Sequence, residues 1–377
     1  GCRDDFGARN VFILPPNQSN QRLHKHVAST HNSGRFLFTE DSSYLQLKKF
    51  INAGATIKVT EFSDEFGYKE WRESNQSSLI LLAVLPNGDI IWTGANVLKN
   101  STGYNLTQLM VGSEGTLGII TKAVFRLIPY PKHILTLLVP FDSPESACEA
   151  VSSVFRAGLT PCAMEFMERD ALEWTIPYVD DFNIDVPDNV NAHLLIEVDG
   201  NELDSLYKEC EQISEIMLEH GSSEVLFADD STQKDALWKL RRRVGEAVKS
   251  HSIYKEEDTV VPRYEMPKLL AGVKEIGSRY GFKSVCYGHV GDGNLHVNIV
   301  KGEMSNEDWN NKLTDGIREI FELTKKLGGT ISGEHGIGYV QKGYLDIVFN
   351  EAELNIQKGV KQLFDPNGIL NPGKVFE

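Results

Sequence analysis

The chain has 377 residues, of which 41% are hydrophobic and 24% charged, and its formal net charge is −15. These proportions are those of an ordinary globular protein and exclude a wholly disordered chain. An acidic surface argues against nonspecific binding to nucleic acid and to anionic lipid surfaces. The longest apolar run, Leu79 to Leu85, is far shorter than the about 20 residues that span a bilayer. We therefore expect a cytoplasmic protein with no transmembrane segment, with peripheral membrane association left open. At about 150 residues per domain, we expect two or three domains.

The cysteines number five, and none of them forms a Cys-x-x-Cys pair. A disulfide scaffold and a thiolate zinc cluster are therefore both unexpected. We interpret these residues as buried or free thiols: Cys2, Cys148, Cys162, Cys210 and Cys286.

Residues 1–76 show no repeat, motif or clear hydrophobic period. A clear pattern begins at Ser77, where Leu79–Leu85 is predicted as a buried strand. The turn Pro86-Asn87-Gly88-Asp89 and a return strand, Ile90–Trp92, complete a predicted hairpin. A further strand is expected over Ile119–Leu127, before a proline-containing linker. We divide the chain into residues 1–76, 77–130 and 131–377.

Strands and helices interleave after Pro131, which indicates an α+β or α/β class. The predicted strands are Ile134–Val139, His193–Val198, Ser284–Tyr287 and His296–Val300. The predicted helices are Ser143–Ala157, with Ser143 as its N-cap, Leu203–His220, Asp235–Lys249, Ser305–Leu327 and Glu351–Phe364.

Two histidines flank the glycine-rich segment that follows Tyr287. If Asp292-Gly293 is a two-residue hairpin turn, His289 faces His296, and Asn298 lies on the same face of the strand. Two converging imidazoles can share a metal ion. The alternative is a pair of polar histidines at a sheet edge.

A second glycine-rich segment, residues 328–338, carries the adjacent pair Glu334 and His335. Glu334 could be a third metal ligand and His335 a general base. The alternative is an acid and a base on an exposed loop.

Three consecutive arginines, Arg241-Arg242-Arg243, lie in a predicted helix. They point in three directions, so at most one or two can line one site. In so acidic a chain such a cluster could bind a substrate carboxylate, although a solvated helix face is the simpler interpretation. The loop Gly112–Gly118 is neither a P-loop nor a dinucleotide-binding fingerprint, because it lacks Lys-Ser/Thr and precedes a strand.

Taken in order, four segments resemble one enzyme family: residues 99–121, 288–296, 332–338 and 370–375. The chain from about residue 78 onward is similar to FAD-linked oxidases of the D-lactate dehydrogenase (cytochrome), glycolate oxidase and D-2-hydroxyglutarate dehydrogenase group. The resemblance implies an α+β protein with a vanillyl-alcohol-oxidase-type FAD domain and a cap domain containing an antiparallel sheet flanked by helices. Residues 1–76 show neither the first FAD subdomain nor the glycine-rich pyrophosphate loop of such proteins, so an incomplete FAD domain and weak or absent FAD binding are expected.

The resemblance also implies roles for individual residues. His289, His296 and Glu334 would be the ligands of a divalent, zinc-like metal, and His335 would take the hydroxyl proton. Arg241 would bind the substrate carboxylate, with Lys255 as a nearby basic partner and Asn298 as a further contact. The flavin-contacting residues would be Ser113, Glu114, Gly115, Thr116, Gly118 and Ile120, next to Asn371.

The expected function is FAD-dependent oxidation of a D-2-hydroxy acid to the 2-oxo acid, with hydride transfer to the flavin. Its expected partners are a small anionic substrate and an electron acceptor: a quinone, a cytochrome or an electron-transfer flavoprotein. A homodimer is also possible. Two alternatives stay open at this point: a flavin-free metal-dependent hydrolase, and a non-catalytic cap fragment that binds a carboxylate or a partner subunit.

Overall fold

The computed structural model describes residues 13–14, 56–57, 78–97, 99–125, 131–179, 186–228 and 230–376. The chain divides into two compact units, each of which we describe by itself. The first unit comprises Gly1–Pro129, Gly336–Gly343 and Phe349–Glu377, and the second comprises Tyr130–His335 and Tyr344–Val348. Within the described residues, no helix is both long and apolar enough to cross a membrane.

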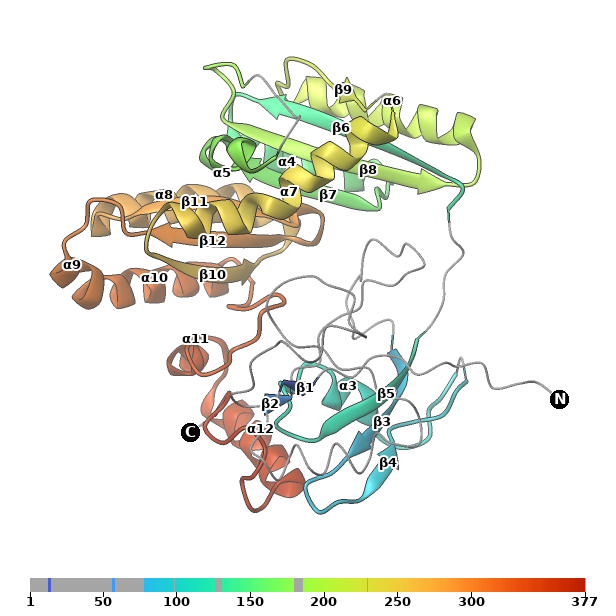
Figure 1. Ribbon diagram of the computed structural model, residues 1–377, viewed down its shortest axis with the longest axis vertical. Coiled ribbons are helices and arrows are strands. Elements are labelled where there is room, and N and C mark those ends of the chain that lie inside the picture. The colour runs from blue at the N-terminus through green and yellow to red at the C-terminus, as the bar shows by residue number, and fades with distance from the viewer. Residues whose placement is uncertain are drawn as a thin grey trace, which may run out of the picture. The chain divides into compact units, whose positions relative to one another are not determined.

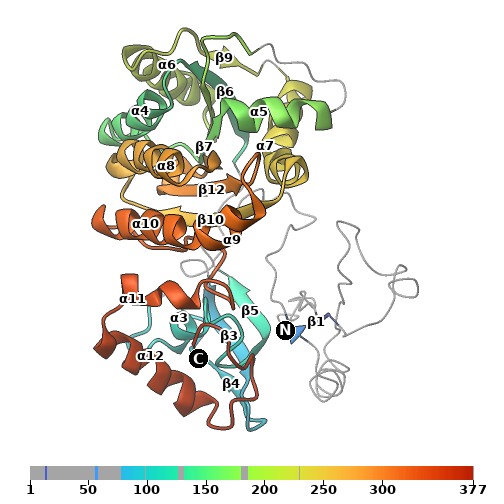
Figure 2. The ribbon, with the colours of Figure 1, turned by 90° about the vertical axis from the view of Figure 1, so that its left-hand side faces the viewer.

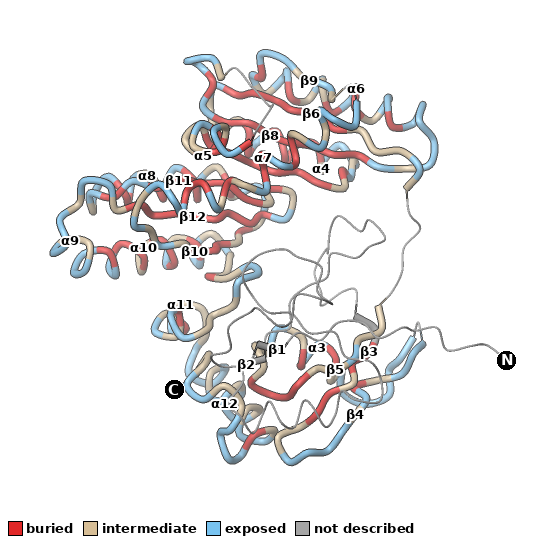
Figure 3. Tube along the Cα trace, in the orientation of Figure 1, coloured by how far each residue is buried: buried red, intermediate tan, exposed pale blue. Residues whose placement is uncertain are grey.

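A seven-stranded sheet forms the centre of the second unit, with strand order β10-β12-β11-β7-β8-β6-β9 (Figure 1). Every neighbouring pair of strands is antiparallel, as expected for the cap domain. The strands are β6 (His133–Phe141), β7 (Ala163–Glu168), β8 (Ala192–Gly200), β9 (Leu226–Phe227), β10 (Tyr254–Val260), β11 (Lys283–Gly288) and β12 (Asn294–Val300). The central strands are almost entirely buried (Figure 3).

Helices cover both faces of this sheet (Figure 2). On one face, α5 and α7 pack over an apolar cluster that includes Leu195, Val244 and Val285. The other face carries α4, α6, α8 and α10. The helices of the unit are α4 (Pro144–Arg156), α5 (Arg169–Thr175), α6 (Leu203–Glu219), α7 (Ser231–His251), α8 (Met266–Tyr280), α9 (Asn306–Asn311), α10 (Leu313–Lys326) and α11 (Leu345–Val348).

Capping side chains explain where several of these helices begin. The hydroxyl of Ser143 accepts a hydrogen bond from the amide of Ser146, so the predicted N-cap of α4 is confirmed. Asp230 caps α7 in the same way, which starts that helix earlier than expected. The single helix predicted over Ser305–Leu327 is wrong, because the chain breaks at Lys312 into α9 and α10.

The predicted hairpin register between the two histidines is also wrong. Tyr287, rather than His289, pairs with His296. The turn is longer than two residues, because Val290–Asp292 form a 3₁₀ turn (η4) that ends at Gly293 with a φ of 78°. His289 therefore lies just beyond the end of β11, where it has left the sheet ladder.

The first unit contains a three-stranded antiparallel sheet of order β4-β3-β5. Its elements are β3 (Ser78–Val84), β4 (Ile90–Trp92), α3 (Leu106–Met110), β5 (Ile119–Phe125) and α12 (Glu351–Phe364), besides the short pair β1 (Ile13–Leu14) and β2 (Thr56–Ile57). The predicted hairpin between β3 and β4 is confirmed. Phe364 of α12 packs against Leu81 and Met110, so the C-terminal helix joins the core of this unit.

Candidate functional site

Polar side chains gather on one face of the edge strands of the seven-stranded sheet. Glu256 pairs with Asn298, and Asp258 pairs with His296, so alternation places all four residues on one face. Asp258 and Asn298 are fully buried, and His296 is 4% exposed. Burial of this many polar groups on one face calls for partners or a ligand.

His289, His296 and Glu334 converge from three parts of the second unit. Nε2 of His289 lies 3.6 Å from Oε1 of Glu334, and Nε2 of His296 lies 3.3 Å from the same oxygen. One ligand atom from each residue lies within 4.8 Å of the others. Ligands of a tetrahedral zinc site lie about 3.4 Å apart, because each bond is about 2.1 Å. The structure brings the three predicted ligands together, and the donor set fits a divalent cation.

The buried carboxylate of Glu165 on β7 orients one of these rings. Its Oε1 lies 2.8 Å from Nδ1 of His289. Burial favours a neutral ring, but the polar contacts with Glu165 and Glu334 outweigh it and raise the pKa of His289 to about 10. The neighbouring imidazoles of His289 and His296 hold the pKa of Glu334 far below its ordinary value, against the effect of burial. This concentration of opposite charge is the environment in which a cation can replace protons.

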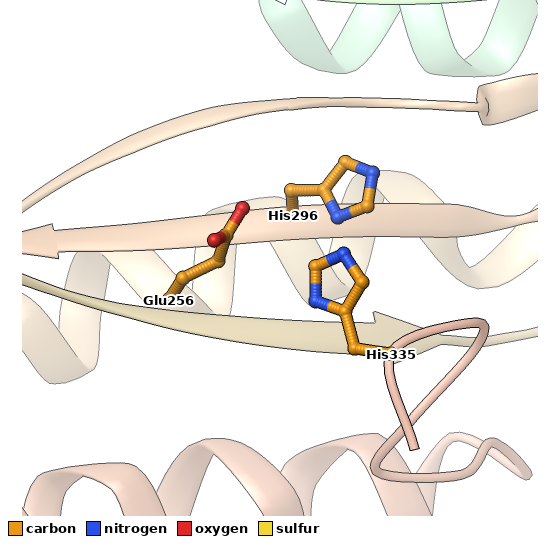
Figure 4. A group of neighbouring side chains, drawn as sticks. All are labelled: Glu256, His296 and His335. Carbon is orange, nitrogen blue, oxygen red and sulfur yellow. The ribbon is translucent and has the colours of Figure 1, made fainter. Parts of the chain in front are cut away.

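A second group of potential ligands shares His296. Figure 4 shows Glu256 on β10 and His335 on the glycine-rich loop, both beside the ring of His296. The rings of His296 and His335 stack with centroids 5.1 Å apart. Glu256, however, already bonds Lys249 at 2.7 Å and accepts from the hydroxyl of Tyr287 at 3.2 Å. The group formed with His289 and Glu334 is therefore better suited to a metal, which leaves His335 beside it with its side chain 42% exposed.

The loop that carries Glu334 and His335 is bound to the edge strand β10. Val260 and Thr330 exchange two backbone hydrogen bonds, of 3.1 and 2.9 Å. The glycines of the loop allow this close approach, since a Cβ at Gly329 would lie 2.0 Å from the carbonyl oxygen of Val260. A Cβ at Gly333 would lie 2.5 Å from Nδ2 of Asn294. Close packing against β10 and Asn294 therefore explains why glycines occupy these two positions of the loop, which their spacing in the sequence does not indicate.

Arg241 lies next to the cluster, but its guanidinium is engaged. Nε donates a hydrogen bond to Oε2 of Glu165 at 2.8 Å, and the side chain is buried. Nη2 lies 2.7 Å from the same oxygen as an ion pair, but it has no hydrogen-bond partner among the described residues. Arg241 thus reaches His289 through Glu165. Lys255, in contrast, is exposed and pairs with Ile299, on the opposite face of the sheet from Glu256 and Asp258. The structure does not bring Lys255 to the cluster.

Asn298 is the most deeply buried of the predicted contact residues. Neither atom of its side-chain amide has a well-formed hydrogen bond among the residues that the structure describes. The phenol of Tyr287 is a polar neighbour of this amide. A buried amide without satisfied hydrogen bonds is available to a ligand.

The predicted flavin-contacting loop lies in the first unit and is partly occupied by contacts within the chain. The backbone of Glu114 is left-handed, with a φ of 52°. Its carboxylate accepts hydrogen bonds from the amides of Ile337 and Gly338. Nδ2 of Asn371 donates to the carbonyl of Glu114 at 2.7 Å, so the predicted neighbourhood of these two residues is confirmed. Thr116 and Gly118 are buried, whereas Ser113, Gly115 and Ile120 are half-buried. The three half-buried residues leave part of their surface open to a ligand.

A sequence model of the family described as FAD linked oxidases, C-terminal domain, matches residues 130–375. The chain belongs to this family. D-lactate dehydrogenase of Anaerostipes hadrus is 36% identical over 299 residues, which cover 78% of this chain and 63% of that protein. Glycolate oxidase subunit GlcD of Bacillus subtilis is 36% identical over 300 residues (78% and 62%). D-2-hydroxyglutarate dehydrogenase of Stutzerimonas stutzeri is 32% identical over 351 residues (90% and 74%). The chain spans slightly less than two thirds of the first two relatives.

Solved structures share the fold at low sequence identity. p-Cresol methylhydroxylase with bound substrate has a TM-score of 0.62 and 15% identity, and the match covers 80% of this chain and 65% of that one. 4-Ethylphenol oxidase from Gulosibacter chungangensis has a TM-score of 0.59, also at 15% identity, with coverages of 80% and 66%. This likeness confirms the expected fold class, an α+β protein of the vanillyl-alcohol-oxidase type.

Three acidic residues of the site, Glu165, Glu256 and Asp258, were missed by the sequence reasoning. Glu256 and Asp258 are two residues apart in the segment Tyr254–Val260, whose strand character was not predicted. Had the strand been predicted, alternation would have placed both carboxylates on one face. Glu165 lies in β7, far along the chain from every glycine motif, and nothing in its local sequence indicates its role.

Proposed function

We propose that the chain provides the substrate site of an FAD-linked enzyme that oxidises a 2-hydroxy acid to the 2-oxo acid. The observation that carries this proposal is the convergence of His289, His296 and Glu334 beside His335, in a chain of the FAD-linked oxidase family. The names of the relatives, D-lactate dehydrogenase, glycolate oxidase and D-2-hydroxyglutarate dehydrogenase, support the substrate class.

In this proposal His289, His296 and Glu334 hold a divalent cation. Such a cation, when bound, acidifies and orients a hydroxyl group. His335 then takes the hydroxyl proton, which is the role of a general base within hydrogen-bond reach of the substrate. Asn298 supplies hydrogen bonds to the bound acid from its unsatisfied amide.

Arg241 is the proposed group for the substrate carboxylate, as one bidentate guanidinium would fix both charge and orientation. Glu165 accepts a hydrogen bond from Nε, whereas the buried Nη2 has no hydrogen-bond partner among the described residues, so the terminal nitrogens of Arg241 are the proposed donors to the substrate. Ser113, Gly115 and Ile120 are the proposed contacts to FAD, which accepts a hydride when bound. The electron acceptor that reoxidises the flavin is proposed by class alone: a quinone, a cytochrome or an electron-transfer flavoprotein.

The test separates metal binding from turnover. The metal-free chain is titrated with Zn²⁺ and with Co²⁺, whose visible spectrum reports the ligand set. We expect one ion per chain, and we expect His289→Ala and His296→Ala to abolish binding. His335→Ala should keep the ion and lose oxidation of D-lactate and glycolate, measured with added FAD and an artificial electron acceptor. Metal binding that survives His289→Ala but not His335→Ala would assign the ion to Glu256, His296 and His335 instead, and would overturn the proposed roles.

A further inference from the structure

Asp258 on β10 is a fully buried carboxylate that is neither a proposed metal ligand nor the proposed base. Its Oδ2 accepts hydrogen bonds from three consecutive backbone amides, those of Gly333, Glu334 and His335, at 2.9, 2.7 and 2.8 Å. The hydroxyl of Ser332 lies 3.3 Å from the same oxygen. One carboxylate oxygen therefore holds the backbone of the proposed ligand Glu334 and of the proposed base His335.

The second oxygen of Asp258 faces the strand that carries His296. Oδ1 accepts from Nδ2 of Asn294 at 2.6 Å and lies 3.6 Å from Nδ1 of His296. Among the described residues, Nδ1 of His296 has no hydrogen-bond partner. A negative charge at this distance would stabilise a proton on Nδ1, so that Nε2, on the side of Glu334, could give its lone pair to a bound cation.

We propose that Asp258 is a positioning residue of the site, because its two carboxylate oxygens contact the loop of Glu334 and His335 on one side and the ring of His296 on the other. The inference rests on the proposed function, since it concerns the same ligands and the same base. Backbone pairing also holds the loop at Ser332, where the Gly333 amide is shared between the carbonyl and Oδ2 of Asp258. The amides of the next two residues, Glu334 and His335, are held by Oδ2. Three charge-assisted hydrogen bonds to one oxygen add direction to that restraint.

The experiment compares Asp258→Asn with Thr259→Val in the full chain. Thr259 is the next residue of the same strand and is equally buried, and its hydroxyl bonds the carbonyl of Leu295 on the other face. Affinity for Zn²⁺ is measured by competition with a chromogenic chelator, together with hydrogen exchange over residues 332–335 and the thermal midpoint. Both variants should lower the midpoint, but only Asp258→Asn should weaken Zn²⁺ binding, by about 10- to 100-fold, and speed exchange in the loop.

Unchanged Zn²⁺ affinity in Asp258→Asn, or an equal loss in Thr259→Val, would overturn the proposal. If Asp258→Asn does not fold, Asn294→Ala replaces it, because that change removes the hydrogen bond to Oδ1 and leaves the carboxylate in place. It should weaken Zn²⁺ binding less than tenfold but measurably, and no loss would again refute the role of Asp258. A wild-type chain that binds no Zn²⁺ would refute the proposed metal site instead. Exchange over residues 332–335 would then decide the role of Asp258 separately.

Discussion

Oε1 of Glu165 lies 2.8 Å from Nδ1 of His289, and this contact connects a buried strand of the sheet to a residue that has left the sheet. Carboxylates that bond the outer nitrogen of a ligating histidine fix its tautomer and ring orientation. Glu165 also binds Arg241, so its position is itself held from α7.

Replacing Glu165 with glutamine should therefore weaken metal binding. We expect Glu165→Gln to raise the Kd for Zn²⁺ by about 10- to 100-fold. It should also lower stability by about 3 kcal/mol, because Arg241 loses its buried partner. Glu246→Gln is the matched control, since it removes one negative charge from an exposed pair with Arg243 on α7. Chelator competition measures the Kd for Zn²⁺, and urea unfolding measures the stability. Equal Zn²⁺ affinities in the two variants would contradict the role of Glu165.

A side chain at Gly333 should disturb the site through packing alone. In Gly333→Ala the new Cβ would meet Nδ2 of Asn294 and a methyl of Val260, both at 2.5 Å. We expect a loss of stability of about 1–3 kcal/mol, as in other overpacked sites, together with weaker Zn²⁺ binding. Gly359→Ala on α12 is the control, because its Cβ meets nothing within 4 Å. This helical change should stabilise the protein by about 0.5–1 kcal/mol. Destabilisation by both variants, measured by urea unfolding, would show that packing at residue 333 is not the cause.

Glu114 should hold residues 336–343 in place within the first unit. Its carboxylate accepts from the amides of Ile337 and Gly338, at 2.7 and 3.0 Å. Glu114→Gln keeps the size but loses the charge, and we expect a cost of about 1–2 kcal/mol. Faster hydrogen exchange over residues 336–343 should accompany it. The control is Glu351→Gln at the exposed start of α12, which should leave those amides protected. Exchange that stays slow in Glu114→Gln would exclude this role.

The stability of the folded protein should decrease as the pH decreases, because of a buried histidine outside the site. Burial, and secondarily the charge of Arg169, lower the pKa of His193 to about 4 from an ordinary value of 6.5. Between these values the unfolded chain binds more protons than the folded chain, so stability is full above pH 6.5 and is lost as the pH falls. The contribution of His193 at pH 5 is a loss of about 2 kcal/mol relative to pH 8.

The variant His193→Gln separates this effect from those of other titrating groups. Urea unfolding of wild type and variant at pH 8 and pH 5 gives the difference in their pH dependence. The wild type should lose about 2 kcal/mol more than the variant between the two pH values. Parallel losses in both proteins would mean that His193 does not carry the pH dependence.

Local patterns in the chain predicted elements whose causes are themselves local. The hairpin at Pro86–Asp89 depends on its turn residues, and the start of α4 depends on the hydroxyl of Ser143. Part of the candidate site can be predicted from the sequence, because His289, His296 and Glu334 lie in glycine-rich segments that resemble motifs of the FAD-linked oxidase family. The break at Lys312 was not predicted, since apolar spacing continues through it and no glycine or proline marks it.

Tertiary structure decided which side chains meet. A 3₁₀ turn shifted the strand register by placing Tyr287 opposite His296, and no short-range pattern specified that turn. Asp258 acquires its function only because the loop of residues 330–335 pairs with the edge strand, more than seventy residues along the chain. Lys255 lies next to Glu256 in the chain yet on the opposite face of the sheet, because strand alternation separates them. Local patterns therefore predict turns, helix starts and short motifs. Contacts between strands depend on the strand register, which is established only when the chain folds.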